Sequence, residues 1–177
     1  MAAKQKVLVL GGGFAALETA FLLRMRHHDD VDIRLVSERD QFLFRSNSIY
    51  VPFGADPDSL LVDLNKPLRR RDIEFERGRV AEVDPDGRLV TLDDGERFGY
   101  DKLVIATGAD TNAAEIPGLA EYGATIWTTD TMLDVRRRFE EARDRSRAGE
   151  RQSVLFLVPP HNKCSGPLYE IVFMLET

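Results

Sequence analysis

A glycine-rich turn is the feature that most constrains the fold of this chain. Residues 11–16 read Gly-Gly-Gly-Phe-Ala-Ala and lie between an apolar run at 6–10 and a helical pattern at 14–26. In such a turn the first glycine allows the tight bend, the next lets the backbone approach a pyrophosphate, and the last alanine keeps the helix close to the sheet. The helix N-terminus then binds the anion. This predicts a dinucleotide-binding βαβ unit, with contacts from Gly11, Gly13, Phe14 and Ala15.

A carboxylate after the second predicted strand supports this interpretation. The strand at 31–36 reads VDIRLV, and Glu38 follows it. A carboxylate there accepts hydrogen bonds from both ribose hydroxyls of an adenine dinucleotide and repels a 2′-phosphate, which disfavours NADP. We assign the adjacent Arg39 to the same site. The alternative is that Glu38 is a solvated loop charge beside Arg39 and Asp40.

The remaining patterns predict an α/β fold with a parallel sheet and an inserted antiparallel meander. Turn sequences at 84–87 and 93–95 separate the short strands of the meander. Another buried strand, at 102–106, ends at Thr107-Gly108. We expect an irregular aromatic segment at 41–54, a helix at 58–71 broken near Pro67, and a loop at 110–122. The other expected elements are meander strands at 73–75, 78–83, 88–92 and 97–100, a helix at 130–147 capped by Asp130, a buried strand at 153–158 and a helix at 168–176.

Charge and composition exclude several classes of function. The net charge is −6 and no basic stripe stands out, so we expect no nucleic-acid partner. A single cysteine excludes an internal disulfide framework. No run approaches the ~18 apolar residues of a membrane span, and no secretory pattern precedes Lys6, so we expect a cytoplasmic protein. His27 and His28 close the first helix, where a cation suits the dipole, and we predict no metal site.

The order of these features resembles a flavoprotein family that includes sulfide:quinone oxidoreductase, flavocytochrome c sulfide dehydrogenase and type II NADH dehydrogenase. Besides the first βαβ unit and the meander, residues 103–109 read Leu-Val-Ile-Ala-Thr-Gly-Ala, like the second FAD segment of that family. The resemblance implies a Rossmann-like FAD-binding domain over residues 1–150. It places Ala106, Thr107 and Gly108 near FAD and the backbone of Val80 against the adenine. Taken alone, Thr107-Gly108 is also compatible with an ordinary strand-to-loop turn.

The residues after 158 distinguish between branches of this family. Pro159 and Pro160 stand where an NADH-binding relative has glycines, and they lack N–H groups, so NADH binding at a second site is disfavoured. Residues 164–170 read Cys-Ser-Gly-Pro-Leu-Tyr-Glu, similar to a stretch of bacterial sulfide:quinone oxidoreductases. Residues 44–48, including Ser46, resemble a loop near the flavin of the same enzymes.

This second resemblance implies that Cys164 is catalytic. In that branch the cysteine works with a second, C-terminal cysteine: sulfide is oxidised, sulfur is held between the two, and two electrons pass to the flavin. The predicted helix after Pro167 and the charge of Lys163 favour an anionic sulfur. The alternatives are a cysteine without a role, and a solvated loop histidine at His161 rather than a base for Cys164.

The resembling enzymes are much longer than 177 residues. We therefore expect a truncated chain in which 151–177 begins a second dinucleotide-type domain, with an exposed apolar face that could form a homodimer. We expect it to bind FAD weakly or not at all and to lack turnover by itself. The missing part would supply the quinone or cytochrome acceptor site and any peripheral membrane attachment. Alternative functions are a stand-alone FAD- or NAD-binding module and a type II NADH dehydrogenase-like enzyme.

Overall fold

The computed structural model of the chain describes residues 3–160 and 164–176. Two compact units share these residues. The first comprises the residues up to Leu43 together with Leu61–Ala109, and the second comprises Phe44–Leu60 and the residues from Asp110 on. These units are defined by packing, whereas the expected boundary at residue 150 separates two dinucleotide-type domains. That boundary therefore stays a prediction.

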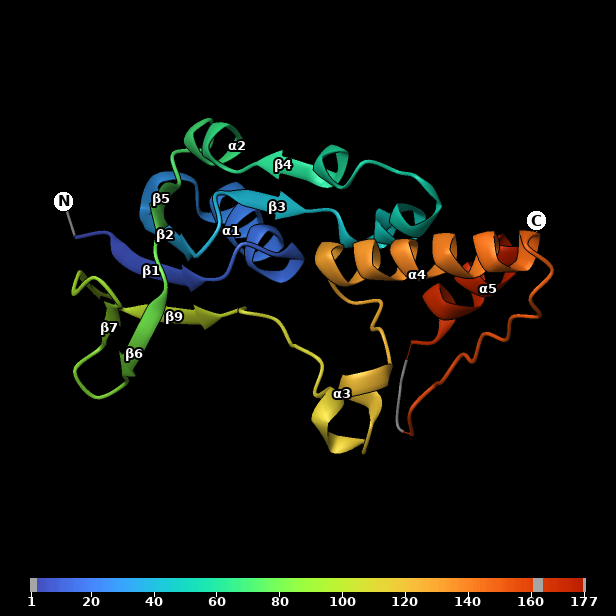
Figure 1. Cartoon of the computed structure of the whole chain (residues 1–177). Helices are drawn as coiled ribbons and strands as arrows, with labels where there is room; N and C mark the ends of the chain where they lie inside the picture. The colour runs from blue at the N-terminus through green and yellow to red at the C-terminus, as the bar shows by residue number, and fades with distance from the viewer. Residues whose placement is uncertain (1–2, 161–163, 177) are drawn as a thin grey trace. The chain divides into compact units, whose positions relative to one another are not determined.

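A four-stranded parallel sheet forms the centre of the first unit, in the order β5-β2-β1-β9 (Figure 1). The predicted βαβ unit is confirmed, and so is the later strand that pairs with β1. Their bounds are β1 Gln5–Leu10, α1 Phe14–His27, β2 Val31–Ser37, β5 Glu74–Arg77 and β9 Lys102–Ile105, with a short 3-10 turn at His28–Asp30. This strand order is that of one half of a doubly wound dinucleotide fold.

Both faces of this sheet are covered, which explains the uninterrupted apolar run of β1. Val7 and Val9 face a cluster that includes Ala16 and Ala20 of α1. The intervening Leu8 and Leu10 belong to a second cluster with residues of the meander. Because side chains alternate along a strand, a strand buried on both faces reads as a continuous hydrophobic run.

The antiparallel meander contains three strands rather than the four expected. These are β6 Val80–Asp84, β7 Leu89–Leu92 and β8 Arg97–Gly99. The prediction that 73–75 begins the meander was wrong, because β5 pairs in parallel with β2, with Arg34 opposite Glu74 and Ser37 opposite Arg77. The pairing extends the main sheet, and Gly78 lies between the two sheets.

The expected helix at 58–71 was also wrong. A 3-10 turn at Pro57–Leu60 leads into β4 (Leu61–Asp63), which pairs antiparallel with β3 (Gln41–Leu43), and only α2 (Asn65–Arg69) is helical. Pro67 lies in the first turn of α2, where a missing N–H breaks no intrahelical bond. The side chain of Asp63 accepts from the Lys66 N–H at 3.2 Å, and the Asn65 side-chain hydrogen bond lowers the pKa of Asp63.

The regular elements of the second unit are all helical in its described residues, and irregular segments connect them. Phe53 packs against Phe139 of α4 (Thr129–Arg147) with ring centroids 6.1 Å apart, and the Arg45 guanidinium lies 4.6 Å from the Trp127 ring centroid. Helical turns interrupt both the predicted irregular segment at 41–54 and the predicted loop at 110–122. The bounds are 3-10 helices Arg45–Phe53 and Ala113–Glu115, and helices α3 Leu119–Tyr122, α4 Thr129–Arg147 and α5 Gly166–Glu176.

The cap of α4 differs from the one predicted. Thr128, not Asp130, is the N-cap: its hydroxyl accepts from the Thr131 N–H at 3.2 Å, and the Thr131 hydroxyl accepts from the Thr128 N–H at 2.9 Å. Threonine is a favoured N-cap residue, although aspartate ranks above it. Asp130 then lies in the first turn, where a negative charge suits the helix dipole.

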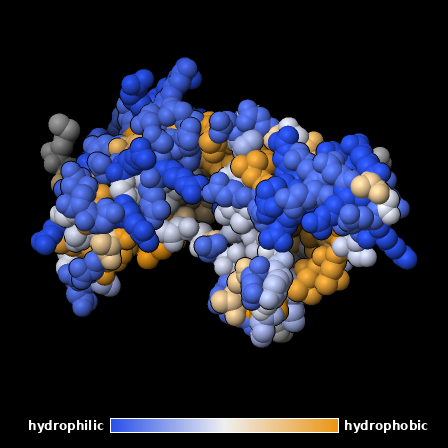
Figure 2. All heavy atoms as spheres, viewed as in Figure 1, coloured by the Kyte–Doolittle hydropathy of each residue, from blue (hydrophilic) through white to orange (hydrophobic). Residues whose placement is uncertain are grey.

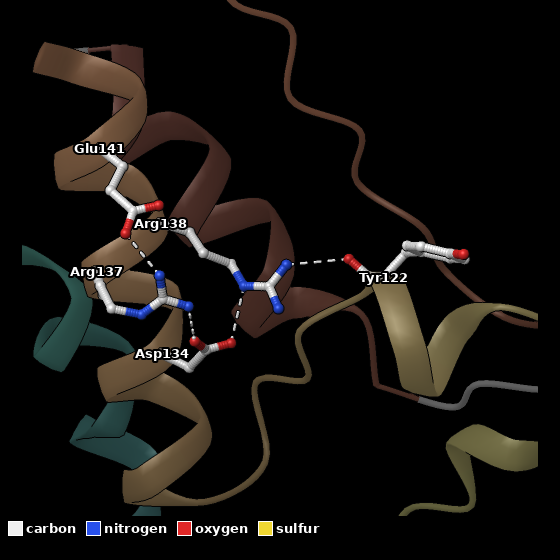
Figure 3. Close-up of polar contacts among 5 residues, drawn as sticks. All are labelled: Tyr122, Asp134, Arg137, Arg138 and Glu141. Atoms are coloured by element: carbon white, nitrogen blue, oxygen red, sulfur yellow. Dashed lines mark hydrogen bonds and ion pairs between the residues drawn. The ribbon is translucent and has the colours of Figure 1, made fainter. Parts of the chain in front are cut away.

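The charged face of α4 carries ion pairs between residues three and four positions apart. Asp134 accepts from Arg137 at 2.6 Å and from Arg138 at 2.8 Å, while Arg137 also reaches Glu141 at 2.6 Å (Figure 3). Arg138 donates in addition to the carbonyl oxygen of Tyr122 at 3.0 Å. Hydrogen bonds from Arg137 lower the pKa of Asp134.

Residues 153–158 do not form the expected strand. The segment has no regular structure and pairs with no strand among the described residues, since an apolar sequence alone does not satisfy the backbone groups of a strand. Val154, Leu155 and Leu157 are exposed, as is Phe173 of α5. Hydrophobic surface, orange in Figure 2, accordingly lies in the same unit as the blue, charged face of α4.

Candidate functional site

The glycine turn meets the end of β9 at the carboxyl edge of the parallel sheet. The Ala106 N–H donates to the carbonyl oxygen of Leu10 at 2.8 Å, which continues the β1–β9 pairing. A Cβ atom added to Gly11 would lie 2.3 Å from the Ala106 carbonyl oxygen, and Gly11 has a φ of 117°. Both the contact and the backbone angle therefore require glycine at this position.

The same turn is fixed on its other side by β2. The Gly11 N–H donates to the carbonyl oxygen of Val36 at 2.8 Å. A Cβ atom on Gly12 would lie 2.6 Å from the Ser37 hydroxyl oxygen. The turn therefore lies between the ends of β2 and β9, at the reversal of strand order where doubly wound sheets bind their ligands.

The start of α1 has the properties of an anion-binding helix end. No side chain caps it, its first turn contains no acidic residue, and Gly13, Phe14 and Ala15 are exposed. A Cβ atom on Gly13 would meet no atom within 4 Å, so the space above the turn is open. The ring of Phe14 packs edge-on against Phe42 at 4.8 Å. N–H groups at such a helix end attract a pyrophosphate.

The predicted ribose carboxylate lies at the end of β2, next to this turn. Glu38 is exposed, and its Oε1 lies 3.6 Å from Nε of Arg79. Arg77 Nε donates to the Glu38 carbonyl oxygen at 3.4 Å. Arg39 is exposed too, and its N–H donates to the Ser37 hydroxyl at 3.3 Å. Glu38 is thus one member of a group of alternating charges.

The second predicted segment lies in the same unit. Thr107 and Gly108 follow β9 and are exposed, and Gly108 has a φ of 82°, which favours glycine. Val80 begins β6 and is half-buried against the meander cluster. With the Gly11–Ala15 and Glu38–Arg39 residues, the first unit therefore contains all the predicted cofactor contacts except Ser46.

Two predicted site residues belong to the second unit. Ser46 is exposed in the first turn of the 3-10 helix Arg45–Phe53, and Cys164 is exposed two residues before α5 begins. The predicted influence of His161 and Lys163 on Cys164 falls outside the described residues. The roles of Ser46 and Cys164 stay predictions.

Three residues that shape this edge were not predicted from the sequence. Gly12 had no separate role within the glycine run, yet a side chain at this position would collide with the Ser37 hydroxyl. Gly78 has no room for a Cβ atom, which would lie 2.4 Å from Leu92 Cδ1. Arg79 approaches Glu38 only because β5 pairs with β2. Gly78 and Arg79 lie at the start of the predicted strand 78–83, and a glycine inside a predicted strand was the available signal.

Metal centres and membrane spans are two further kinds of site that residues 3–160 and 164–176 could form. Within them, no three His, Cys, Asp or Glu side chains are grouped so that they could hold a metal ion. None of the helices that the structure describes is both long enough and apolar enough to cross a membrane.

Comparison with known proteins agrees with this geometry. Residues 5–151 match the family described as "Pyridine nucleotide-disulphide oxidoreductase". Sulfide-quinone reductase of Aquifex aeolicus is 32% identical over 172 residues, which cover 96% of this chain and 38% of that protein. NADH dehydrogenase-like protein Rv1812c of Mycobacterium tuberculosis is 30% identical over 142 residues, which cover 76% of this chain and 34% of that protein.

A solved structure shares the fold. The sulfide:quinone oxidoreductase of Aquifex aeolicus superposes with a TM-score of 0.74 at 31% identity, covering 80% of this chain and 33% of that one. The chain therefore spans little more than a third of the length of the relatives that it matches.

Proposed function

Because the chain belongs to the pyridine nucleotide-disulphide oxidoreductase family, as its motifs indicated, we propose that its first unit binds the adenine dinucleotide portion of FAD. The observation that carries this proposal is the meeting of the Gly11–Gly13 turn with the Ala106–Gly108 segment at one edge of the sheet. The two motifs are far apart in sequence, and each alone is weak evidence for a cofactor. Their junction at the strand-order reversal is where a dinucleotide belongs.

Each residue at this edge has a distinct role in the proposal. The open N-terminus of α1, from Gly13 to Ala15, supplies N–H groups to the pyrophosphate. Glu38 accepts hydrogen bonds from the ribose hydroxyls. Thr107 and Gly108 place backbone beside the cofactor. Val80 contributes its backbone to the adenine, and Arg39 completes the set within the first unit. The predicted contact from Ser46, which belongs to the second unit, stays a prediction.

When bound, FAD supplies the two-electron redox chemistry, and the chain's own residues hold and orient it. We further propose that a protein containing this chain oxidises a sulfur compound and passes the electrons to a quinone. The Aquifex relative, a sulfide-quinone reductase, supports this assignment. Cys164 would be the residue that bonds to sulfur, since its exposed side chain is accessible to a small substrate.

NADH is the rival electron donor, since another relative is an NADH dehydrogenase-like protein. One observation argues against it. The segment after 153–158 continues into Pro159 and Pro160, neither of which has an N–H group for a second pyrophosphate. We therefore favour a sulfur donor over NADH.

An absorbance spectrum of the purified chain tests the cofactor assignment. The protein is mixed with FAD, desalted and scanned. We expect weak binding: little flavin survives desalting, but titration gives a saturable change in FAD fluorescence. Gly13→Ala and Glu38→Gln should each weaken that binding, with Lys4→Gln as the control at the opposite end of the sheet. A wild-type chain that shows neither retained flavin nor a saturable change in FAD fluorescence would contradict the proposal.

Sulfide addition under anaerobic conditions tests the sulfur assignment in a flavin-bound, longer protein that contains this chain and the second, C-terminal cysteine that the resemblance implies. We expect the flavin absorbance to bleach with wild type and with Ser165→Ala, and to persist with Cys164→Ser. Equal bleaching of the cysteine variant would remove Cys164 from the proposed reaction. Bleaching by NADH but not by sulfide would favour the rival donor.

A further inference from the structure

The backbone of Arg79 is held at the end of β2 by both sheets of the first unit. The preceding Gly78 donates its N–H to the carbonyl oxygen of Ser37 at 3.0 Å, and the Arg79 carbonyl oxygen accepts from the Asp93 N–H at 2.9 Å. Gly78 is also tightly packed against Leu92. The Arg79 side chain therefore starts from a fixed point although 73% of it is exposed.

Two arginines approach Glu38, Arg79 at its carboxylate and Arg77 at its backbone carbonyl oxygen. Nε of Arg79 lies 3.6 Å from Glu38 Oε1, and Arg77 donates to the Glu38 carbonyl oxygen at 3.4 Å. Arg77 is itself paired with Asp40, at 3.6 Å. The side chain of Glu38 is thus the acid that faces Arg79, and neutralising Glu38 would leave the Arg79 guanidinium without that counter-charge.

We propose that Glu38 and Arg79 together determine which adenine ribose the site accepts. This rests on the proposed function, which places the ribose at Glu38. Glu38 selects a free 2′-hydroxyl, because its charge accepts a hydrogen bond from the hydroxyl and repels a 2′-phosphate. Arg79 positions that carboxylate. Without the charge of Glu38, Arg79 is a ready partner for a 2′-phosphate, since guanidinium groups bind phosphate by charge-assisted hydrogen bonds.

Binding of two simple nucleotides to the full chain tests the inference. The probes are 5′-ADP and adenosine 2′,5′-bisphosphate, measured by calorimetry at one ionic strength. The proteins are wild type, Glu38→Gln, Arg79→Gln, the double variant and Lys4→Gln. Lys4 is the matched control, because it forms a similarly exposed pair with Asp32, at 3.7 Å, at the start of β2. Thermal melting checks that each variant is folded.

The expected pattern is a reversal of preference. Wild type, Lys4→Gln and Arg79→Gln bind 5′-ADP more tightly than the bisphosphate, with Arg79→Gln weakened severalfold for 5′-ADP. Glu38→Gln binds the bisphosphate about tenfold more tightly than 5′-ADP, as one charge-assisted contact allows. The double variant loses that gain.

Two results would overturn the inference, and they are distinguishable. If the double variant binds the bisphosphate as tightly as Glu38→Gln does, Arg79 has no part in the choice while the ribose assignment of Glu38 stands. If wild type and Glu38→Gln bind 5′-ADP equally, the ribose is not at Glu38, and that part of the proposed function fails together with the inference.

Discussion

The carbonyl oxygen of Ala106 lies so close to Gly11 that a Cβ atom on the glycine would be 2.3 Å from it. The contact joins two segments almost a hundred residues apart, the glycine turn after β1 and the Ala-Thr-Gly segment after β9. It involves backbone rather than a flexible side chain, so neither partner can yield without moving a strand end. The close approach of two strand ends thus depends on one missing methyl group.

Gly11→Ala is therefore expected to destabilise the first unit. The substitution places a methyl group against the Ala106 carbonyl and forces alanine to a φ of 117°. The backbone conformation alone costs about 1–3 kcal/mol. Urea denaturation of the variant should show a lower midpoint, together with reduced retention of FAD. An unchanged midpoint would mean that β1 and β9 do not meet in this way.

Gly13→Ala is expected to separate cofactor binding from stability. A Cβ atom at this position meets no atom of the chain within 4 Å, so the free energy of unfolding should change by less than about 1 kcal/mol. The methyl group would instead occupy the space proposed for the pyrophosphate. FAD affinity, measured by fluorescence titration, should fall at least about tenfold, the effect of losing one to two kcal/mol of binding. Unaltered affinity in the folded variant would place the phosphates elsewhere.

The features that could be predicted from sequence are local ones. The turn, α1 and Glu38 follow from glycine spacing, apolar period and position along the first βαβ unit. The approach of Arg79 to Glu38 could not be predicted in this way, because it depends on which strand pairs with β2. Residues 73–75 carry no local signal that distinguishes a parallel neighbour of β2 from a meander strand.

At segment 153–158 a clear local signal gave a wrong prediction. Its apolar run is typical of a buried strand, but strand formation also requires a neighbouring backbone, and the described residues pair none with it. The predicted N-cap of α4 was wrong for a different reason. Thr128 and Asp130 are both favourable N-cap residue types, and the hydrogen bonds of Thr131 decide between them.

Arg24 is expected to be important for the stability of the first unit. Its guanidinium donates to the carbonyl oxygens of His28, Val31 and Asp72, the bonds to Val31 and Asp72 being 3.0 Å and 2.6 Å long. His28 and Asp72 have positive φ angles, so the arginine holds two strained turns. Arg24→Ala should lower the free energy of unfolding by about 1–3 kcal/mol.

The matched control for Arg24 is Arg26→Ala, because Arg26 is an exposed arginine of the same helix turn. Arg26→Ala should change the free energy of unfolding by no more than about 0.5 kcal/mol. Chemical denaturation of the two variants side by side measures the difference. Equal effects would show that the three carbonyl contacts add nothing beyond the helix propensity and charge of an arginine.

Thr128→Ala is expected to shorten α4 from its N-terminus. The variant loses the hydroxyl that accepts from the Thr131 N–H. The reciprocal hydrogen bond, from the N–H of residue 128 to the Thr131 hydroxyl, is then no longer held in place by its counterpart. Loss of such a cap costs about 1 kcal/mol. Thr129→Ala, within the first turn, should be neutral or slightly stabilising because alanine has the higher helix propensity. Circular dichroism during thermal unfolding compares them, and a smaller loss for Thr128 than for Thr129 would exclude the capping box.

Asp134→Asn is expected to make α4 less stable at neutral pH but not in acid. Hydrogen bonds from Arg137, then Arg138, lower the pKa of Asp134 below its ordinary value. A lowered folded-state pKa contributes stability above the unfolded-state value, and that contribution is lost as the pH falls through the folded-state value. The stability difference between wild type and Asp134→Asn should therefore shrink as unfolding is measured from about pH 7 to about pH 2.

Asp144→Asn is the control. The pairs of Asp144 with Arg143 and Arg147 are longer, at 3.6 Å and 3.9 Å, and its charge lies at the unfavourable end of the helix dipole. Removing this charge should therefore cost no stability at pH 7. A pH-independent loss at Asp134 would mean that the side chain acts through packing rather than through its charge.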